Sequence, residues 1–122
     1  MQKRKEWLNK LFSNDCVMGG TLSSSFIGAA GLNGIQRNLT VVDESAFTSE
    51  PDAIIAAVHS NRIALIGDAQ QLPPISHNFQ MQRSLQERLG RLSGMDPILL
   101  TECFRMPLQI AAWPNLFYYE SR

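Results

Sequence analysis

Hydrophobic positions along the chain predict a strand, a helix and a second strand in its central part. Leu39–Val42 and Ile63–Ile66 are short apolar runs rich in β-branched residues, a pattern typical of buried strands. Between them, Thr48 or Ser49 is expected to cap a helix over about Glu50–His59, with Pro51 in its first turn. We expect this helix to bury three apolar side chains, those of Ile54, Ile55 and Val58. A strand–helix–strand unit with short connections is right-handed, so the two strands are predicted to be parallel in an α/β fold.

The second predicted strand runs directly into a polar loop, and Arg62–Pro74 reads RIALIGDAQQLPP. Gly67 and Asp68 end the apolar run, and Gln70 and Gln71 follow it. The two prolines at the exit fix φ and remove two backbone donors, which makes the loop rigid. Ligands of open α/β sheets bind at the carboxyl ends of the strands. The pattern therefore predicts a rigid polar loop beside a bound ligand.

Further elements are predicted on both sides of this unit. Helical spacing of apolar residues predicts a helix over Gln80–Leu92, with an apolar stripe formed by Met81, Leu85, Leu89 and Leu92. Pro107 is expected to begin a last helix, which Pro114 kinks or ends. The other expected elements are an amphipathic helix and two short strands, over Lys3–Phe12, Asp15–Met18 and Ile98–Leu100.

Composition narrows the class of protein only slightly. The 122 residues carry 11 basic and 11 acidic side chains, so net charge neither favours nor excludes a nucleic-acid partner. All three lysines lie within the first ten residues, where a solvated helix face is the simplest interpretation. Two cysteines are too few for a disulfide framework or a zinc site. Without a signal peptide or a membrane-spanning run, we expect an intracellular protein of the nucleus or the cytoplasm.

The candidate chemistry lies at the carboxyl ends of the two central strands. Asp43 and Glu44 follow the first strand, and such a pair suits a phosphate-and-metal site. The first carboxylate can hold Mg²⁺ through water, and the second can take a proton from an attacking water. Gln71 can hydrogen-bond that water and a terminal phosphate, and Arg105 can stabilise a transferring phosphoryl group. Taken alone, an acidic pair at a strand end is more often a solvated strand terminus.

A hydroxyl-rich segment precedes this unit. Thr21–Phe26 reads TLSSSF, and the side chains of Thr21, Ser23 and Ser24 could contact nucleic-acid phosphates. A run of serines is more often simply a loop.

Three segments together resemble successive motifs of the superfamily 1 helicases. VVDES over Val41–Ser45 resembles the Walker B motif, GDAQQLPPI over Gly67–Ile75 resembles motif III, and LTECFRMP over Leu100–Pro107 resembles the motif IV arginine segment. The continuation QIAAWPNLFYYESR is similar to the branch that contains senataxin and the nonsense-mediated-decay helicase. TLSSSF resembles the loop that lies near nucleic acid in that branch. The resemblance extends from about Asp15 to the last residue.

The resemblance implies a site for ATP and Mg²⁺. It implies that Asp43 holds Mg²⁺ through water, that Glu44 is the general base, and that Gln71 senses the γ-phosphate. It further implies that Arg105 reaches the γ-phosphate across a domain cleft, while Gly67 and Asp68 shape the sensor loop. Ser45 and Phe47 stand where this family usually carries alanine and glutamine.

The implied fold is a partial RecA-like P-loop NTPase domain with a parallel sheet, followed by the start of a second RecA-like domain. Residues 1–97 would form the C-terminal part of the first domain, and residues 98–122 the beginning of the second. No lysine follows Lys10, so these residues contain no Gly-rich phosphate loop ending in Gly-Lys-Ser/Thr. The strand that would carry that loop normally lies beside the motif III strand, so we expect Arg62–Ile66 to form an unprotected sheet edge.

The sequence therefore predicts a fragment of an ATP-dependent DNA or RNA helicase or translocase. It would need the rest of the helicase chain, and the 122 residues alone would be inactive. One alternative is a non-catalytic helicase-like module that binds nucleic acid or a protein partner without ATP turnover. Another, an unrelated α/β hydrolase using Asp43, Glu44 and His77, has no support from the spacing of those residues.

Overall fold

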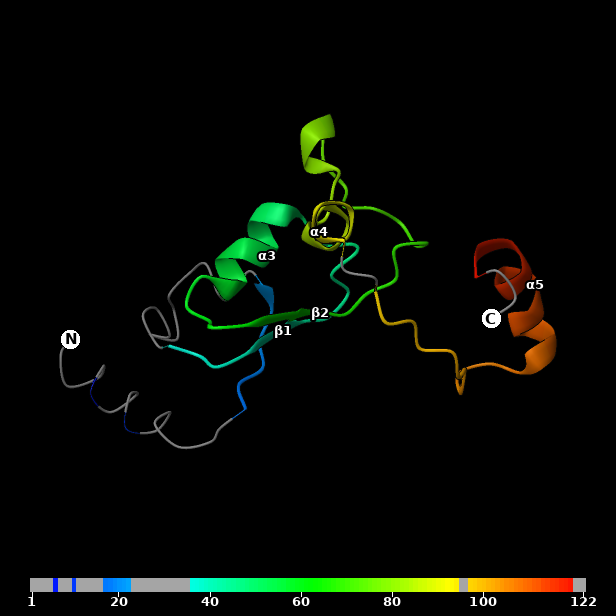
Figure 1. The fold of residues 1–122 in the computed structure, drawn as a ribbon, viewed down its shortest axis with the longest axis horizontal. Coiled ribbons are helices and arrows are strands. Elements are labelled where there is room, and N and C mark those ends of the chain that lie inside the picture. Colours follow the sequence, from blue (N-terminus) through cyan, green and yellow to red (C-terminus); the bar gives the residue numbers. More distant parts are fainter. Residues whose placement is uncertain (1–5, 7–9, 11–16, 23–35, 95–96, 120–122) are drawn as a thin grey trace.

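A computed structural model of the chain describes residues 6, 10, 17–22, 36–94 and 97–119. Within these ranges the chain forms an α/β unit followed by a further helix (Figure 1). The elements in chain order are β1 (Thr40–Val42), α3 (Glu50–Ala57), β2 (Ile63–Leu65), the 3-10 helix η1 (Phe79–Met81), α4 (Leu85–Ser93) and α5 (Leu108–Tyr118).

The two strands pair in parallel, as predicted. Thr40 lies opposite Ile63 and Val42 opposite Leu65. The Ile66 N–H donates to the Val42 carbonyl at 2.9 Å, which carries the pairing to the carboxyl ends of both strands. In the described part of the chain the sheet has these two strands, so one edge of β2 is unpaired there.

Helix α3 packs on the sheet through small side chains. Of the two caps expected, Thr48 and Ser49, the structure has Ser49, whose side chain accepts a hydrogen bond from the Asp52 N–H. The prediction that Ile54, Ile55 and Val58 are buried is wrong. Ala53 and Ala56 are buried instead, at 0% and 7% exposure, whereas Ile54 is 47% exposed. The two alanines are three residues apart on one helix face, and their short side chains let α3 approach its neighbours β1 and α4 closely.

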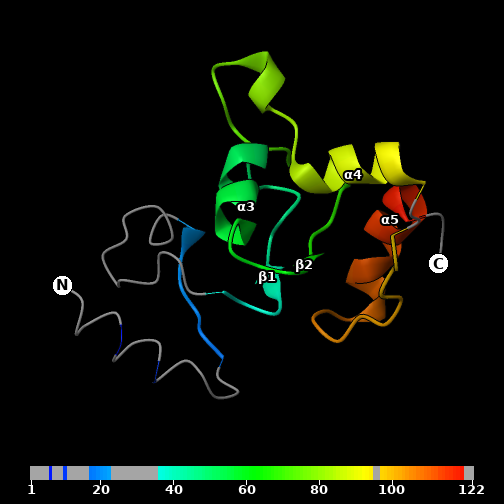
Figure 2. The same cartoon turned by 60° about the vertical axis from the view of Figure 1, so that its left-hand side comes forward.

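Helix α4 begins later than predicted. Asn78 caps the short η1, and Ser84 then caps α4 by accepting from the Glu87 N–H at 3.1 Å. This N-cap fixes the helix start at Leu85, five residues beyond the predicted start. Met81 therefore lies outside α4, and both it and Leu92 are exposed, so the predicted apolar stripe is not buried along its length. Figure 2 shows α4 from the side, with its first turn beside α3.

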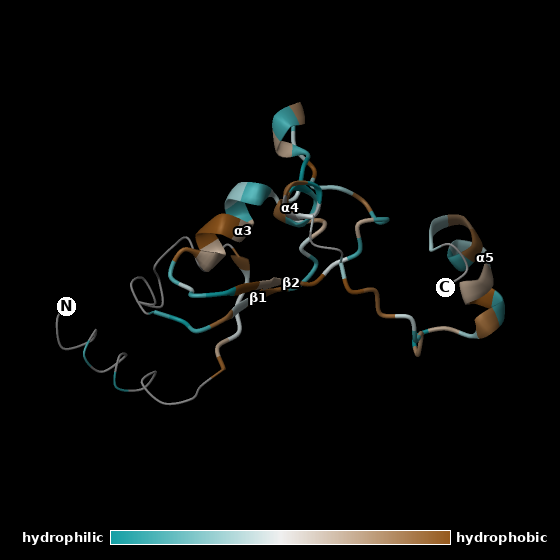
Figure 3. Ribbon diagram, viewed as in Figure 1, coloured by the Kyte–Doolittle hydropathy of each residue, from teal (hydrophilic) through white to brown (hydrophobic). Residues whose placement is uncertain are grey.

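The C-terminal part departs from the prediction in two ways. The strand expected over Ile98–Leu100 is absent, because residues 97–104 adopt no regular structure and Ile98 is 92% exposed. Pro107 immediately precedes α5 as expected, but Pro114 lies inside the helix, which continues to Tyr118. No residue of α5 is buried, and Figure 3 shows the apolar residues distributed along it.

The expected helix over Lys3–Phe12 and the loop over Thr21–Phe26 fall largely outside the described residues. Of the strand predicted over Asp15–Met18, Val17 and Met18 are described, and neither belongs to a strand. Among the described residues no helix is both long and apolar enough to cross a membrane.

Candidate functional site

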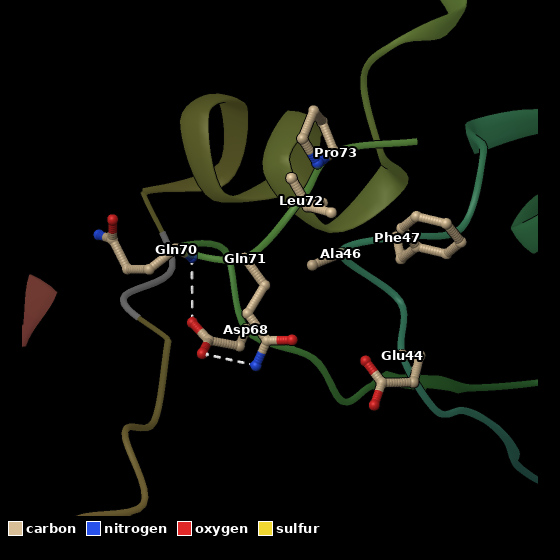
Figure 4. Close-up of a pocket in the computed structure, with 8 residues that line it drawn as sticks. All are labelled: Glu44, Ala46, Phe47, Asp68, Gln70, Gln71, Leu72 and Pro73. Atoms are coloured by element: carbon tan, nitrogen blue, oxygen red, sulfur yellow. Dashed lines mark hydrogen bonds between the residues drawn. The ribbon is translucent and has the colours of Figure 1, made fainter. Parts of the chain in front are cut away.

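A pocket of about 440 Å³ lies between the segments that follow β1 and β2 (Figure 4). The first segment contributes Glu44, Ala46 and Phe47, and the second contributes Asp68, Gln70, Gln71, Leu72 and Pro73. Parallel pairing of β1 and β2 places both segments at the same edge of the sheet. The fold thus brings three predicted site residues, Glu44, Asp68 and Gln71, to one pocket.

The two segments approach each other closely because Gly67 has no side chain. The Ser45 N–H donates to the Ile66 carbonyl at 2.8 Å, one residue before Gly67. A Cβ atom on Gly67 would lie 2.7 Å from the Ala46 nitrogen and 2.9 Å from the Ser45 nitrogen. Those atoms belong to the backbone and cannot rotate away, so a larger residue would separate the two walls of the pocket.

A polar network that includes the buried Ser45 side chain holds the same junction from the side of α4. Ser45 is 1% exposed, and its hydroxyl donates to Gln86 Oε1 at 2.6 Å. Gln86 Nε2 in turn donates to the Gly67 carbonyl at 3.0 Å. Gln86 therefore ties α4 to the segments after both strands. Ser45 and Gln86 are 41 residues apart, and no sequence pattern connects them, which is why sequence analysis missed Gln86.

The acidic pair adopts an unusual backbone conformation. Glu44 has φ +51°, in the left-handed region that non-glycine residues rarely occupy. The Thr48 hydroxyl and the Phe47 N–H both donate to its carbonyl at 3.1 Å, which holds the turn in this conformation. The Glu44 N–H donates to Asp43 Oδ1 at 3.0 Å. Glu44 lines the pocket, whereas Asp43 is exposed at the strand end and does not line it.

The Asp68 carboxylate organises the loop after β2. Its Oδ1 accepts the Gln70 N–H, and its Oδ2 accepts Gln71 Nε2, both at 3.0 Å. Because the Gln71 nitrogen is engaged with Asp68, its amide oxygen is directed away from Asp68, to the Glu44 side of the pocket (Figure 4). This orientation presents a hydrogen-bond acceptor to the pocket.

Tyr119 is a further partner of Asp68 that sequence analysis missed. Its hydroxyl donates to Asp68 Oδ2. Partial burial raises the pKa of the Asp68 carboxyl, but the hydrogen bonds from Tyr119, Gln70 and Gln71 outweigh this effect and bring the pKa below 3.8. The same hydrogen bond to Asp68 raises the pKa of Tyr119 to about 12, with desolvation and the negative charge adding to it. At neutral pH the carboxylate is therefore charged and the phenol keeps its proton.

The other predicted site residues lie apart from this pocket. Arg105 is in the exposed stretch before α5 and does not line the pocket. Thr21 is exposed, and Ser23 and Ser24 are outside the described residues. Within the described ranges no group of three or more histidine, cysteine or acidic side chains could hold a metal ion.

Comparison with known proteins places the chain in a family. The family model described as an AAA domain (AAA_11) matches residues 1–78. An uncharacterized ATP-dependent helicase of Methanocaldococcus jannaschii is 28% identical over 117 residues, which cover 94% of this chain and 17% of that protein. The DNA replication ATP-dependent helicase/nuclease of Xenopus laevis is 34% identical, over 67% of this chain and 8% of that protein. The regulator of nonsense transcripts 1 homolog of Drosophila melanogaster is 29% identical, over 76% of this chain and 8% of that protein.

The chain therefore belongs to the AAA-domain family of superfamily 1 helicases. The resemblance to the branch of the nonsense-mediated-decay helicase is confirmed. The α/β unit with its parallel strands fits part of a RecA-like helicase domain. The chain spans less than a fifth of the length of the three relatives described above.

Proposed function

We propose that this chain forms the hydrolysis and sensing part of an ATP-dependent DNA or RNA helicase or translocase. The observation that carries the proposal is the pocket at the carboxyl edge of the sheet, where Glu44 and Gln71 come from two different strands. Two relatives of this chain are ATP-dependent helicases by name, and this supports ATP as the ligand of the pocket. The segment Val41–Ser45 then acts as Walker B and Gly67–Ile75 as motif III.

Glu44 would take a proton from the water that attacks the γ-phosphate. An exposed carboxylate in the wall of an open pocket can reach a water and exchange its proton with solvent. The Gln71 amide oxygen would accept a hydrogen bond from the same water and so orient it. Rotation of this amide would instead present Nε2 to a phosphate oxygen, which makes the side chain sensitive to whether the phosphate is present.

Asp43 would hold Mg²⁺ through water. A single carboxylate suits this ion when ATP is present, because Mg²⁺ retains several waters and takes its remaining ligands from phosphate oxygens. The hydrogen bond from the Glu44 N–H fixes Asp43 Oδ1 at the end of β1, beside the pocket wall. When bound, the ion would neutralise charge on the phosphate oxygens.

The division into two RecA-like domains follows the same proposal. Residues 1–97 would belong to the first domain, and residues 98–122 would begin the second. Arg105 would then reach the γ-phosphate when the two domains close, which agrees with its position on an exposed stretch outside the pocket. The phosphate loop would come from the rest of the helicase chain, and the 122 residues alone would not turn over ATP.

Nucleic acid is the proposed substrate, along which the helicase would move. The names of the relatives refer both to DNA replication and to nonsense transcripts, so both DNA and RNA stay open. We propose that Thr21, which is exposed, contacts the nucleic acid together with Ser23 and Ser24. Hydroxyl side chains suit contacts to backbone phosphates, which position a protein without reading sequence.

The proposal is tested by ATP turnover of the full reading frame and of its Glu44→Gln variant. Loss of the general base should lower kcat by at least about 100-fold, while nucleotide binding persists. Glu87→Gln is the matched control, because Glu87 pairs with Arg91 on the surface of α4, away from the pocket. Undiminished turnover in Glu44→Gln would refute the assignment.

A non-catalytic helicase-like module is the second candidate. The observation that favours it is the lack of a phosphate loop within these 122 residues. A full reading frame that binds nucleic acid but neither binds nor hydrolyses ATP would establish this alternative.

A further inference from the structure

Tyr119 connects the C-terminal helix to the loop that carries Gln71. The residue follows α5 directly, and its partner Asp68 lies 51 positions earlier in the chain. The phenol hydroxyl donates to Asp68 Oδ2, the same oxygen that accepts Gln71 Nε2. A single carboxylate oxygen therefore joins Tyr119 to the side chain proposed to sense the phosphate.

Both carboxylate oxygens of Asp68 accept hydrogen bonds that fix the side chain. The Gln70 N–H fixes Oδ1 from within the loop, and Tyr119 fixes Oδ2 from outside it. Hydrogen bonds to a charged carboxylate are about twice as strong as neutral ones. Without Tyr119 the carboxylate would keep its bonds to the Gln70 N–H and to Gln71, but it would be held less firmly against rotation about its Cβ–Cγ bond, and so would the Gln71 amide.

Packing would do little to keep α5 in place. No residue of α5 is buried, and the preceding stretch is exposed. Polar contacts therefore contribute a larger share of the interactions that hold α5 in place. The lowered pKa of Asp68 and the raised pKa of Tyr119 agree with a strong bond between a carboxylate and a neutral phenol. A shift of α5 away from the loop would break this bond.

We propose that Tyr119 is a positioning residue that holds the Gln71 amide, through Asp68, with its oxygen toward the pocket. Because Tyr119 is fixed to α5, movement of this helix loosens the hold of Asp68 on Gln71, and the position of the C-terminal segment is transmitted to the sensor. The positional part stands on the hydrogen bonds alone. Its consequence for ATP hydrolysis rests on the proposed function.

The positional part is tested on the 122-residue chain by nuclear magnetic resonance of glutamine side-chain amides. The variants are Tyr119→Phe, which removes the hydroxyl, and Tyr118→Phe, which removes the neighbouring hydroxyl and serves as the matched control. Tyr119→Phe should move both Gln71 Nε2–H signals and speed their exchange with water about two- to tenfold, the factor that one ordinary hydrogen bond represents. Tyr118→Phe should leave them unchanged.

A second variant guards against a change of fold. Asp68→Asn keeps the size of the side chain but removes the charged acceptor, and it should move the Gln71 signals as Tyr119→Phe does. Dispersed backbone amide signals verify that each variant is folded. Gln71 signals that stay in place in a folded Tyr119→Phe chain would overturn the proposal.

The consequence for hydrolysis is measured separately in the full reading frame. Tyr119→Phe should lower kcat for ATP about two- to tenfold with KM unchanged, because the bond orients a catalytic side chain without touching the nucleotide. Equal changes in kcat and KM would contradict this role. If the unaltered protein shows no turnover while the Gln71 signals respond, the proposed function fails and the positioning role of Tyr119 stands.

Discussion

The central unit, residues 36–94, and the C-terminal segment, residues 97–119, are held together by different kinds of interaction. In the central unit the backbone hydrogen bonds of the sheet, two helix caps and the part-buried Ser45–Gln86 hydrogen bond fix the walls of the pocket. The C-terminal segment contributes no buried residue and reaches the pocket loop through the Tyr119–Asp68 hydrogen bond. Glu44 and Gln71 therefore lie on segments fixed by the sheet and by α4, whereas Arg105 lies on an exposed stretch without regular structure.

The largest expected effect comes from separating the two pocket walls where Gly67 approaches the backbone of Ser45 and Ala46. Gly67→Ala places a Cβ 2.7 Å from the Ala46 nitrogen, and we expect it to lower the free energy of unfolding by about 1–3 kcal/mol. Gly90→Ala is the control, because nothing lies within 4 Å of a Cβ there and the glycine is inside α4. It should raise the free energy of unfolding by about 0.5–1 kcal/mol. Urea unfolding measures both, and equal effects would refute the close-approach explanation.

The second way to destabilise the central unit is to remove the Ser45–Gln86–Gly67 hydrogen-bond network. Gln86→Leu leaves the buried Ser45 hydroxyl without its partner, and it should cost about 1–3 kcal/mol of stability. Gln82→Leu is the matched control, because the exposed Gln82 side chain donates to the Ser76 carbonyl in the loop. Its cost should stay below about 0.5 kcal/mol. Similar costs for both variants, in the same unfolding experiment, would show that the network does not stabilise the unit.

The attachment of the C-terminal segment should depend on pH. The folded pKa of Tyr119 is raised to about 12, so its contribution to stability is complete below the unfolded pKa of about 10 and is lost as pH rises through about 12. The folded pKa of Asp68 is lowered, so its contribution is present above pH 3.8 and is lost as pH falls through the lower folded value. Unfolding of Tyr119→Phe between pH 10 and 12 should lack the loss seen in Tyr118→Phe. Parallel pH curves for the two variants would contradict the Tyr119–Asp68 bond.

Local patterns predicted those features that depend on neighbours in sequence. The parallel strands, the Ser49 cap and the start of α5 after Pro107 all follow from composition within a few residues. The same patterns predicted that Glu44, Asp68 and Gln71 lie at one sheet edge, since the carboxyl ends of parallel strands meet there, and the three residues line one pocket.

Features that depend on distant contacts could not be predicted in this way. Hydrophobicity favoured Ile54 over Ala53 as the buried residue of α3, but the close approach of the helix selects the smaller side chain. The partners Gln86 and Tyr119 are 41 and 51 residues from the groups they bind, and no spacing rule connects them. The prediction of a strand over Ile98–Leu100 was wrong because, in the described ranges, no neighbouring strand pairs with this segment.

The central claim is that Glu44 and Gln71 act on the same water from the two walls of one pocket. It is tested most directly by a double-mutant cycle on kcat for ATP, with Glu44→Gln, Gln71→Ala and the combined variant of the full reading frame. Groups that act as one unit are strongly non-additive, so the combined loss should be close to that of Glu44→Gln alone. A combined loss equal to the product of the two single losses would show that the side chains act independently and would contradict the claim.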